Sequence, residues 1–374
     1  ARRCNTGRRG CLRRSISEKL DIRIHSVVIT EDLIFKQLSL SPENLYMALI
    51  EAENLSKTFR IYNQGEGVKG YLKSFVSRDY REVDAVEDLD LEIEEGEMVG
   101  YIGSNGAGKS TTVKMLTGIL EPSSGRIEID GLDPHAQRKR NAMNIGVVFG
   151  QKTQLWWDLP VKESFRLLKE IYEVPDEKYD ERIDRFDDVL QLSEFWDQPV
   201  RKLSLGQKMR CELAASFLHY PKIVYLDEPT IGLDVAVKER IREFIKEMNS
   251  EEEITVMLTT HDIGDIEDLC ERIVVLDEGK KIYDGSLDAL VNRFTSRRLL
   301  MEFRGDVDVD QEIEGVLETE DSSSEVEIVF DPGTVSASDL ISGLLERHEV
   351  VDFQLKEPDV ESVVKKIYNE GLEE

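Results

Sequence analysis

The stretch MVGYIGSNGAGKSTTVKML, residues 98–116, decides the fold class of this 374-residue chain. Residues 98–102 form a short apolar run that is typical of a buried strand. After Lys109, apolar residues recur at helical spacing, at Val113, Leu116 and Ile119. The stretch therefore predicts a strand, a glycine-rich loop and a helix in direct succession.

The loop carries Gly103, four further residues and then Gly108-Lys109-Ser110, which is the pattern G-x-x-x-x-G-K-[ST]. Its glycines let the backbone curl until N–H groups face an anion at the helix N-terminus. Lys109 is expected to reach the β- and γ-phosphates of a nucleotide, and the Ser110 hydroxyl to bind Mg²⁺. A chance glycine-rich turn is the alternative, but the flanking strand and helix favour nucleotide binding. The predicted binding residues are Gly103, Ser104, Asn105, Gly106, Ala107, Gly108, Lys109, Ser110 and Thr111.

A second strand end carries acidic residues, in KIVYLDEPT, residues 222–230. The continuous apolar run at 223–226 is expected of a central parallel strand. Asp227 and Glu228 follow it, at the strand end where ligands bind in open α/β sheets. Alone, such a pair is more often a solvated strand end. Together with the glycine-rich loop, it predicts Asp227 in the Mg²⁺ shell and Glu228 as the general base that polarises a water.

Between the two motifs lies KLSLGQKMR, residues 202–210. From here the chain resembles the ATP-binding cassette (ABC) ATPases, whose nucleotide domains carry an LSGGQ-like signature. The signature reads Leu203-Ser204-Leu205-Gly206-Gln207 here, with a leucine in place of the first glycine. The resemblance implies that Ser204, Gly206 and Gln207, at a helix N-terminus, bind the nucleotide of a partner subunit.

The remaining family positions follow in order, and the resemblance covers roughly residues 48–294. It implies that Gln151 in VVFGQK contacts Mg²⁺ and senses the γ-phosphate, and that Asp234 in IGLD crosses a dimer interface. His261 in MLTTHD matches the switch histidine that contacts the γ-phosphate, after a helix at roughly 235–249. The implied fold class is α/β: a P-loop NTPase of the ABC type, with a helical subdomain and an antiparallel β subdomain. Catalysis is expected from Glu228, His261, Gln151 and Lys109, and metal binding from Ser110, Gln151 and Asp227.

The family also places an adenine-stacking aromatic before the strand that leads into the phosphate loop. Tyr80 in RDYREVDAV has the more usual spacing, whereas Phe59 in SKTF is the motif-like alternative. We favour Tyr80, which makes IYNQGEGVKGYLKSFVS, residues 61–77, an insertion. Ordinary packing at a strand edge is the plain alternative for both aromatics.

Three segments are expected: a basic leader at 1–46, the ABC ATPase domain at 47–294 and an accessory domain at 295–374. The leader has nine Lys and Arg against five Asp and Glu, and it lacks the apolar stretch of a secretory signal. We expect a native start at Met47 and an upstream translation artefact before it, with a disordered basic tail as the alternative.

The tail is expected to be a small α+β domain. LLMEFRG, EVEIVFDP and VVDFQLKEP are typical of strands, while SASDLISGLLER and DVESVVKKIYNEG have helical patterns. ETEDSSSE, residues 318–325, is predicted to be a polar loop. We expect this domain to stabilise the protein or to brace a dimer, with binding of a regulatory ligand as the alternative.

The composition limits the classes of partner. A net charge of −28 opposes nucleic-acid binding, because the field repels phosphates. Four cysteines match neither a zinc site nor a disulfide framework. No apolar run approaches the roughly 20 residues that span a bilayer, so a role in transport requires separate permease chains.

The sequence therefore predicts the ATP-hydrolysing subunit of an ABC transporter, peripheral on the cytoplasmic face of the membrane and driving a separate permease. Two copies, or one copy and a paralogue, would enclose two ATP·Mg²⁺ between residues 103–111 of one and 204–207 of the other. Export is preferred, because GQKTQLWWDLP together with LSLGQKMR resembles an exporter-type prokaryotic subgroup. Two alternatives are a soluble ABC machine acting on ribosomes or chromosomes and a regulator that binds ATP without hydrolysing it. A single phosphate loop, the charge and the presence of Glu228 and His261 argue against both.

Trp156 and Trp157 lie side by side just after Gln151 and before a helix expected near Val161. Adjacent residues of an extended loop point in opposite directions. The resemblance implies that this region forms a groove for a short permease helix, so we expect one tryptophan to be buried and the other to line that groove. The alternative is that both are shielded as local core.

Overall fold

The computed structural model describes residues 48–62, 80–150, 152–293, 297–304, 315–322 and 325–356, together with 360, 363, 364 and 367. Contacts divide the chain into residues 1–47 and 48–374, and every described residue belongs to the second unit. The expected leader, most of the expected insertion and Gln151 therefore lie outside the described residues.

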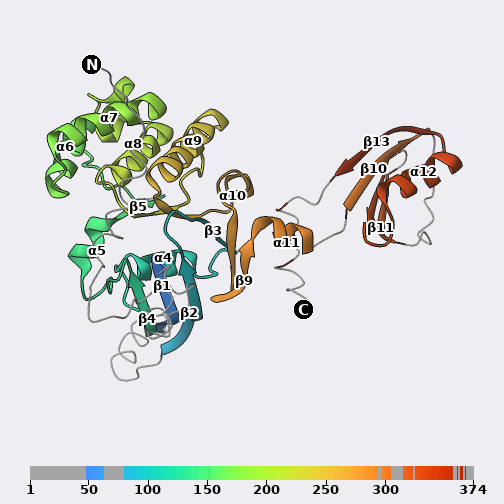
Figure 1. The fold of residues 1–374 in the computed structure, drawn as a ribbon, viewed down its shortest axis with the longest axis horizontal. Coiled ribbons are helices and arrows are strands. Elements are labelled where there is room, and N and C mark those ends of the chain that lie inside the picture. Colours follow the sequence, from blue (N-terminus) through green and yellow to red (C-terminus); the bar gives the residue numbers. More distant parts are fainter. Residues whose placement is uncertain are drawn as a thin grey trace, which may run out of the picture. The chain divides into compact units, whose positions relative to one another are not determined.

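A six-stranded sheet has the order β5-β6-β7-β3-β8-β9 (Figure 1), and the 103–110 loop, the acidic pair at 227–228 and His261 lie at the ends of three of its strands. All neighbouring pairs are parallel except β8 with β9. The strands are β3 (Met98–Gly103), β5 (Ile145–Phe149), β6 (Ile223–Asp227), β7 (Thr255–Thr259), β8 (Arg272–Asp277) and β9 (Lys280–Ser286).

β6 shows why its sequence is continuously apolar. Ile223 and Tyr225 belong to the buried cluster on one face of the sheet, whereas Val224 and Leu226 belong to the cluster on the other. Successive side chains of a strand point to opposite faces, so a strand covered on both sides needs an apolar residue at every position. The prediction of a central parallel strand is confirmed.

One face of this sheet packs on helix α4 and on an antiparallel sheet of order β2-β1-β4. The elements are β1 (Ile50–Tyr62), β2 (Tyr80–Ile93), β4 (Ser124–Ile129), α4 (Lys109–Leu116) and, beyond them, α5 (Arg138–Asn144). The helix expected through Ile119 ends earlier, at Leu116, because Gly118 adopts a left-handed φ of 73°. That part of the prediction is wrong, and Ile119 is exposed.

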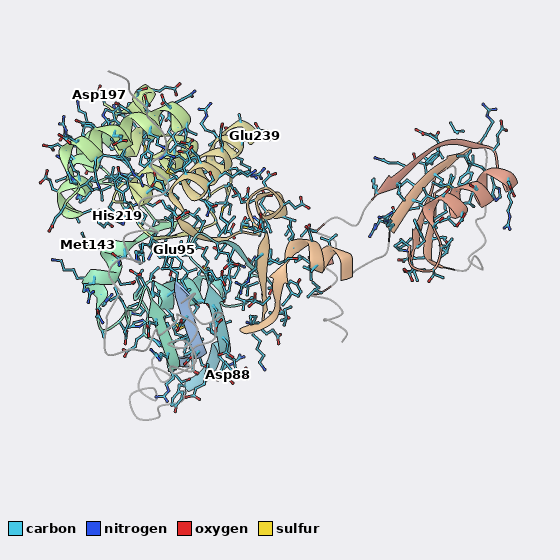
Figure 2. The ribbon with its side chains drawn as sticks, in the orientation of Figure 1. Asp88, Glu95, Met143, Asp197, His219 and Glu239 are labelled. Atoms are coloured by element: carbon cyan, nitrogen blue, oxygen red, sulfur yellow. The ribbon has the colours of Figure 1, made fainter. Side chains whose placement is uncertain are left out.

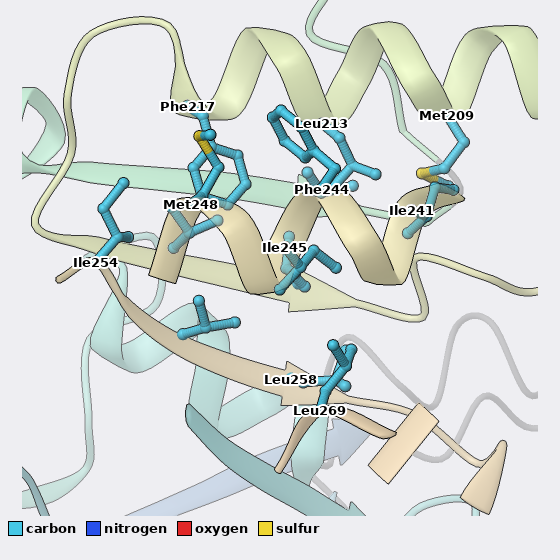
Figure 3. Packing of buried hydrophobic residues seen from close by; sticks show 14 of the residues in the cluster. Met209, Leu213, Phe217, Ile241, Phe244, Ile245, Met248, Ile254, Leu258 and Leu269 are labelled. Carbon is cyan, nitrogen blue, oxygen red and sulfur yellow. The ribbon is translucent and has the colours of Figure 1, made fainter. Parts of the chain in front are cut away.

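The other face is covered by helices. They are α6 (Val161–Ile171), α7 (Asp176–Leu190), α8 (Leu205–Phe217), α9 (Val235–Glu252), α10 (Ile263–Leu269) and α11 (Leu287–Arg293), with 3₁₀ turns at Leu192–Phe195 and Val200–Lys202. Figure 3 shows α8 packed against α9, with Phe217 meeting Phe244 edge to face at 5.2 Å between ring centroids. The helices that begin near Val161 and Val235 confirm those two sequence predictions.

A separate buried cluster belongs to a sheet of order β11-β12-β10-β13 and helix α12. These elements are β10 (Arg297–Phe303), β11 (Val316–Ser322), β12 (Glu325–Phe330), α12 (Ala337–Arg347) and β13 (Val350–Lys356). The polar loop predicted at 318–325 is wrong, since residues 318–322 form β11 and pair with β12. An edge strand needs only one strand partner and one apolar face, so it tolerates polar residues that would exclude it from a sheet interior.

The buried residues of the last helical segment join a different cluster from that sheet. Val360, Val363, Val364 and Ile367 belong to the large cluster that contains Leu287 and Leu290 of α11. No helix in the described part of the chain has the length and apolar character that crossing a membrane requires. Acidic side chains such as Asp88, Asp197 and Glu239 lie on the outside (Figure 2), as a large negative net charge requires.

Candidate nucleotide-binding site

The loop between β3 and α4 is held in shape by close packing on its outer side. Gly108 adopts a φ of 105°, and a Cβ there would lie 2.4 Å from the Ala85 carbonyl oxygen. A Cβ on Gly103 would lie 2.8 Å from the Leu276 carbonyl oxygen. Side chains are therefore excluded at both positions, and the loop can approach its neighbours only as bare backbone.

Lys109 turns back into the loop that precedes it. Its Nζ donates to the carbonyl oxygens of Gly103 at 2.6 Å and Ser104 at 3.1 Å. Burial lowers the pKa of this amine, while Glu228 and Asp227 oppose that change. The half-buried ammonium thus donates to two neutral carbonyl oxygens. Charged phosphate oxygens would be stronger hydrogen-bond acceptors for it.

The loop opens on a cavity of about 480 Å³, within the range of small-molecule sites. It is lined by Asn105, Gly106, Gly108, Lys109, Ser110, Thr111, Lys114, Ile119, Phe149, Gly150, Lys152, Asp227, Glu228 and Ile231. The structure thus brings the glycine-rich loop and the acidic strand end together around one space. Lysines and carboxylates line the same space. The lysines can bind phosphate oxygens, and the carboxylates can bind the cation that accompanies a phosphate group.

Asp227 lies between two hydroxyl groups at the end of β6. Ser110 Oγ is 3.3 Å from its Oδ2, and Thr259 Oγ1 donates to its Oδ1 at 2.6 Å. Hydroxyl and carboxylate oxygens are the hard ligands that Mg²⁺ prefers, and Mg²⁺ usually takes its remaining ligands from substrate phosphates and water. Among the described residues no cluster of three or more acidic, His or Cys side chains forms a complete metal site. The pair of Ser110 and Asp227 fits a nucleotide-bound Mg²⁺.

Thr259 is a residue of the site that the sequence did not predict. It ends β7 and pairs with Asp227 in the parallel register of β6 and β7. The signal was its place two residues before His261, at the carboxyl end of a predicted strand. Only the strand order shows that this end lies beside Asp227.

Glu228 adopts a left-handed φ of 56°, and its N–H donates to the Thr259 carbonyl oxygen at 2.8 Å. Its Oε2 lies 2.6 Å from His261 Nδ1, and the carboxylate faces the cavity. Burial raises the pKa of Glu228, although His261 partly offsets the change. A carboxylate with a raised pKa is a better proton acceptor, which is the property a general base needs.

The predicted signature forms a helix cap elsewhere on the chain. Ser204 Oγ accepts the Gln207 N–H at 3.2 Å, and Gln207 Oε1 accepts the Ser204 N–H at 2.9 Å. This capping box starts α8. Asp234 likewise caps α9 by accepting the Val237 N–H at 3.0 Å. Ser204, Gly206, Gln207 and Asp234 do not line the cavity, and neither do Gly103, Ser104 and Ala107 of the loop. The predicted residues of the signature and of the D-loop therefore lie away from the cavity as helix caps.

Comparison with known proteins decides the family. The family profile described as ABC transporter matches residues 86–231. The chain is 34% identical over 208 residues to the ABC transporter ATP-binding protein NatA of Bacillus subtilis (strain 168), which covers 56% of this chain and 84% of NatA. This chain belongs to the ABC transporter ATP-binding proteins.

Two further relatives extend the comparison. The cassette is 34% identical over 209 residues to the methionine import ATP-binding protein MetN of Geobacillus kaustophilus (strain HTA426), covering 55% of this chain and 61% of MetN. It also resembles the ATP-binding cassette MJ0796, solved as a dimer in a post-hydrolysis state with ADP and phosphate. That likeness has a TM-score of 0.53 and 28% identity, and covers 64% of this chain and 98% of MJ0796. The predictions of an ABC-type P-loop fold and of an ATPase are confirmed.

Tyr80 and Gln151 remain predictions, as do the roles of the other predicted site residues. Tyr80 begins β2 and lies across from Tyr62 on β1, with the Arg60 guanidinium 5.0 Å from its ring centroid. Neither Tyr80 nor Phe59 is among the residues that line the cavity. Gln151 lies outside the described residues, although both of its neighbours line the cavity.

The loop after Gln151 corrects the expectation for the two tryptophans. Trp156 is 37% exposed and Trp157 is 54% exposed, whereas the preceding Leu155 is buried. The prediction that one tryptophan is buried is wrong, and so is the alternative that both are core. Leu155 occupies the inward position instead, which leaves the cassette with two adjacent aromatic side chains on its surface.

Glu212 connects this loop to the signature helix of the cassette. It lies on α8, and its carboxylate accepts hydrogen bonds from the Thr153 hydroxyl and, at 3.2 Å, from the Gln154 N–H. Burial raises the pKa of Glu212, and the two hydrogen bonds oppose the change. Displacement of residues 152–157 would therefore act directly on α8, the helix that Ser204 caps.

Proposed function

We propose that this chain is the ATP-hydrolysing subunit of a membrane transporter and that two copies, or one copy and a paralogue, close around two ATP·Mg²⁺. The observation that carries this proposal is the cavity in which the 103–111 loop meets Asp227 and Glu228. The capped Ser204–Gln207 segment does not line that cavity, and in the proposed dimer the second chain supplies it. The dimeric state of MJ0796 supports the same arrangement.

Each side chain of the site has a proposed task in hydrolysis. Lys109 neutralises the β- and γ-phosphates, and backbone N–H groups of residues 103–111 hold the same oxygens. Glu228 accepts the proton of the attacking water as the bond from the γ-phosphorus to the bridging oxygen breaks and ADP leaves. His261, whose Nδ1 lies 2.6 Å from Glu228 Oε2, is proposed to contact the γ-phosphate as well. Ser110 and Asp227, together with Gln151, would hold Mg²⁺, which supplies charge neutralisation to the leaving phosphates.

Phosphate release tests this proposal directly. The purified chain should release phosphate from ATP in the presence of Mg²⁺ and stop when EDTA removes the metal. A chain that binds ATP but releases no phosphate, alone or with a permease, would instead be a regulator.

The pH dependence of hydrolysis should report the contact between His261 and Glu228. His261 lowers the raised pKa of Glu228, so His261→Ala should raise that pKa further. The base works only when deprotonated, and the acid limb of the kcat/KM profile should therefore move to higher pH. His348→Ala, on the accessory domain, serves as the control and should leave the limb in place. An unmoved limb in His261→Ala would contradict the role of Glu228 as the titrating base.

The permease partner is proposed from the surface of the cassette. Trp156 and Trp157 lie exposed beside α6, and large aromatic side chains are enriched at the centres of protein interfaces. We place a short helix of a separate permease chain on this surface, with the cassette peripheral on the cytoplasmic face of the membrane. Export is proposed from the resemblance of residues 150–160 and 203–210 to an exporter-type subgroup, although MetN is named as an importer. Neighbouring reading frames that encode permeases, and the direction of transport in vesicles, test this.

Alanine substitutions of the tryptophans should separate docking from packing. Trp156→Ala and Trp157→Ala should each change the free energy of unfolding by less than about 1 kcal/mol and leave basal ATP hydrolysis unchanged, because both side chains are exposed. Association with the permease, measured by co-purification, should be lost in at least one of them. Trp196→Ala is the control for loss of packing, because the ring centroids of Trp196 and Phe165 are 5.1 Å apart. This substitution should lower the free energy of unfolding by about 3 kcal/mol. Normal association of both surface variants with the permease would show that the permease docks on another surface.

A further inference from the structure

The last strand of the accessory sheet leaves an apolar row uncovered. Among the described residues β13 pairs with β10 alone, so one side of its backbone has no strand partner. Val351, Phe353 and Leu355 are 55%, 49% and 38% exposed. Leu299 and Met301, which lie opposite Leu355 and Phe353 on β10, are buried with α12. The apolar face of the sheet therefore extends onto β13, where α12 does not cover it.

The charged residues of β13 are mismatched within their own sheet. Asp352 lies opposite Glu302 on β10, and Lys356 lies opposite Arg298. Like charges directly across a strand pair are destabilising. Arg298 pairs with Glu327 on its other side, at 2.7 Å. Asp352 and Lys356 form no ion pair with the part of the chain that the structure describes, and the open side of β13 leaves room for a complementary charge.

We propose that β13 pairs with β13 of a second copy of this chain, antiparallel and about a two-fold axis at Gln354. In that register Asp352 lies opposite Lys356 of the second copy, twice by symmetry. Phe353 lies opposite Leu355 of the second copy on the other face, also twice. The two accessory sheets become one continuous sheet, and the two exposed apolar rows lie side by side on one face, where Phe353 and Leu355 of the two copies shield each other in part.

The sequence of β13 favours a copy of itself over another partner. Asp352, Gln354 and Lys356 are evenly spaced on one face, so the strand is charge-complementary to its own reversed copy. A parallel pairing in register would set Asp352 against Asp352, and an antiparallel pairing centred on Phe353 would leave both charges opposite uncharged residues. A two-fold interface in which residue i meets residue j, and j meets i, is the usual form of homodimer contact.

This interface goes beyond the proposed function, because it does not require nucleotide. It would keep two cassettes at a high effective concentration between rounds of hydrolysis. It also commits the pair to two copies of one chain rather than to a paralogue, unless the paralogue carries the same strand.

Charge exchange on the full chain tests the interface. Without nucleotide, wild type should dimerise in sedimentation experiments. Asp352→Lys and Lys356→Asp should each raise the dimer Kd by about tenfold, because two attractive cross-strand pairs become repulsive. The double variant D352K/K356D restores both pairs and should return Kd to the wild-type value. A monomeric wild type, or a double variant no better than the single ones, would overturn the proposal.

Cross-linking tests the register. Gln354→Cys, in a chain with Cys4 and Cys11 changed to serine, should form an intermolecular disulfide on mild oxidation, since directly paired Cα atoms lie within disulfide range. Leu317→Cys, on the opposite edge strand β11, is the matched control and should not cross-link. Cross-linking through Phe353→Cys but not Gln354→Cys, or through Leu317→Cys, would overturn the register. Phosphate release by these variants keeps the result separate from the proposed function: a failed interface with intact hydrolysis removes only the β13 contact.

Discussion

Glu228→Gln should lower kcat for ATP hydrolysis by about a thousandfold, the size of effect expected when a positioned general base is removed. The amide keeps the shape of the side chain and an oxygen to face His261, which lies 2.6 Å from the carboxylate. It cannot take the proton of the attacking water. ATP affinity should not fall, because a negative charge beside the phosphate site is removed. The expected product is a stable ATP-bound dimer, measured by phosphate release and light scattering.

The chain contains a close match for the control. Glu278 also follows an aspartate at the carboxyl end of a parallel strand, β8, and it also adopts a left-handed φ, of 44°. It is exposed and does not line the cavity. Glu278→Gln should hydrolyse ATP at the wild-type rate. If Glu228→Gln did the same, the proton would be accepted by another group.

Gly108→Ala should abolish nucleotide binding and destabilise the cassette by about 3 kcal/mol or more, because two penalties add. A φ of 105° is unfavourable for alanine, and the new Cβ would lie 2.4 Å from the backbone oxygen of Ala85. A backbone atom of a paired strand cannot move aside as a flexible side chain can. The loop must therefore open, and the N–H groups that face the cavity lose their arrangement. Urea unfolding without nucleotide, and titration with an ATP analogue, measure the two effects.

Gly106→Ala separates the clash from the backbone strain. Gly106 has a φ of 90°, but a Cβ there meets no atom within 4 Å. Its alanine variant should cost only about 1–2 kcal/mol, from the strained φ. Equal stability of the Gly106 and Gly108 variants would mean that the loop relaxes away from Ala85, contrary to the structure.

The sequence predicted best those features that depend on a few neighbouring residues. The loop at 103–110 and the acidic pair 227–228 each combine a backbone requirement with a strand end, and both were located correctly on the fold. The spacing of Ser204 and Gln207 is that of a capping box, although the cap itself was recognised only in the structure.

Other features depend on contacts between distant segments, which the sequence does not show. Thr259 reaches Asp227 because β6 and β7 are neighbours in register. Trp156 and Trp157 both stay at the surface because Leu155 takes the buried position. β11 forms from polar residues because β12 offers it an edge. In each case a contact with another segment determines where the residue lies, and the local sequence pattern does not show that contact.

The last helical residues decide how the accessory sheet can be removed. Val360, Val363, Val364 and Ile367 share a buried cluster with Leu287 and Leu290, so the chain contributes to the cassette on both sides of residues 297–356. A stop codon after α11 would strip four apolar side chains from the ATPase and leave a hole in its interior. Excision of 297–356, with a short flexible join between the two ends, would keep that interior filled. Loss of function after simple truncation would accordingly say little about the accessory sheet itself.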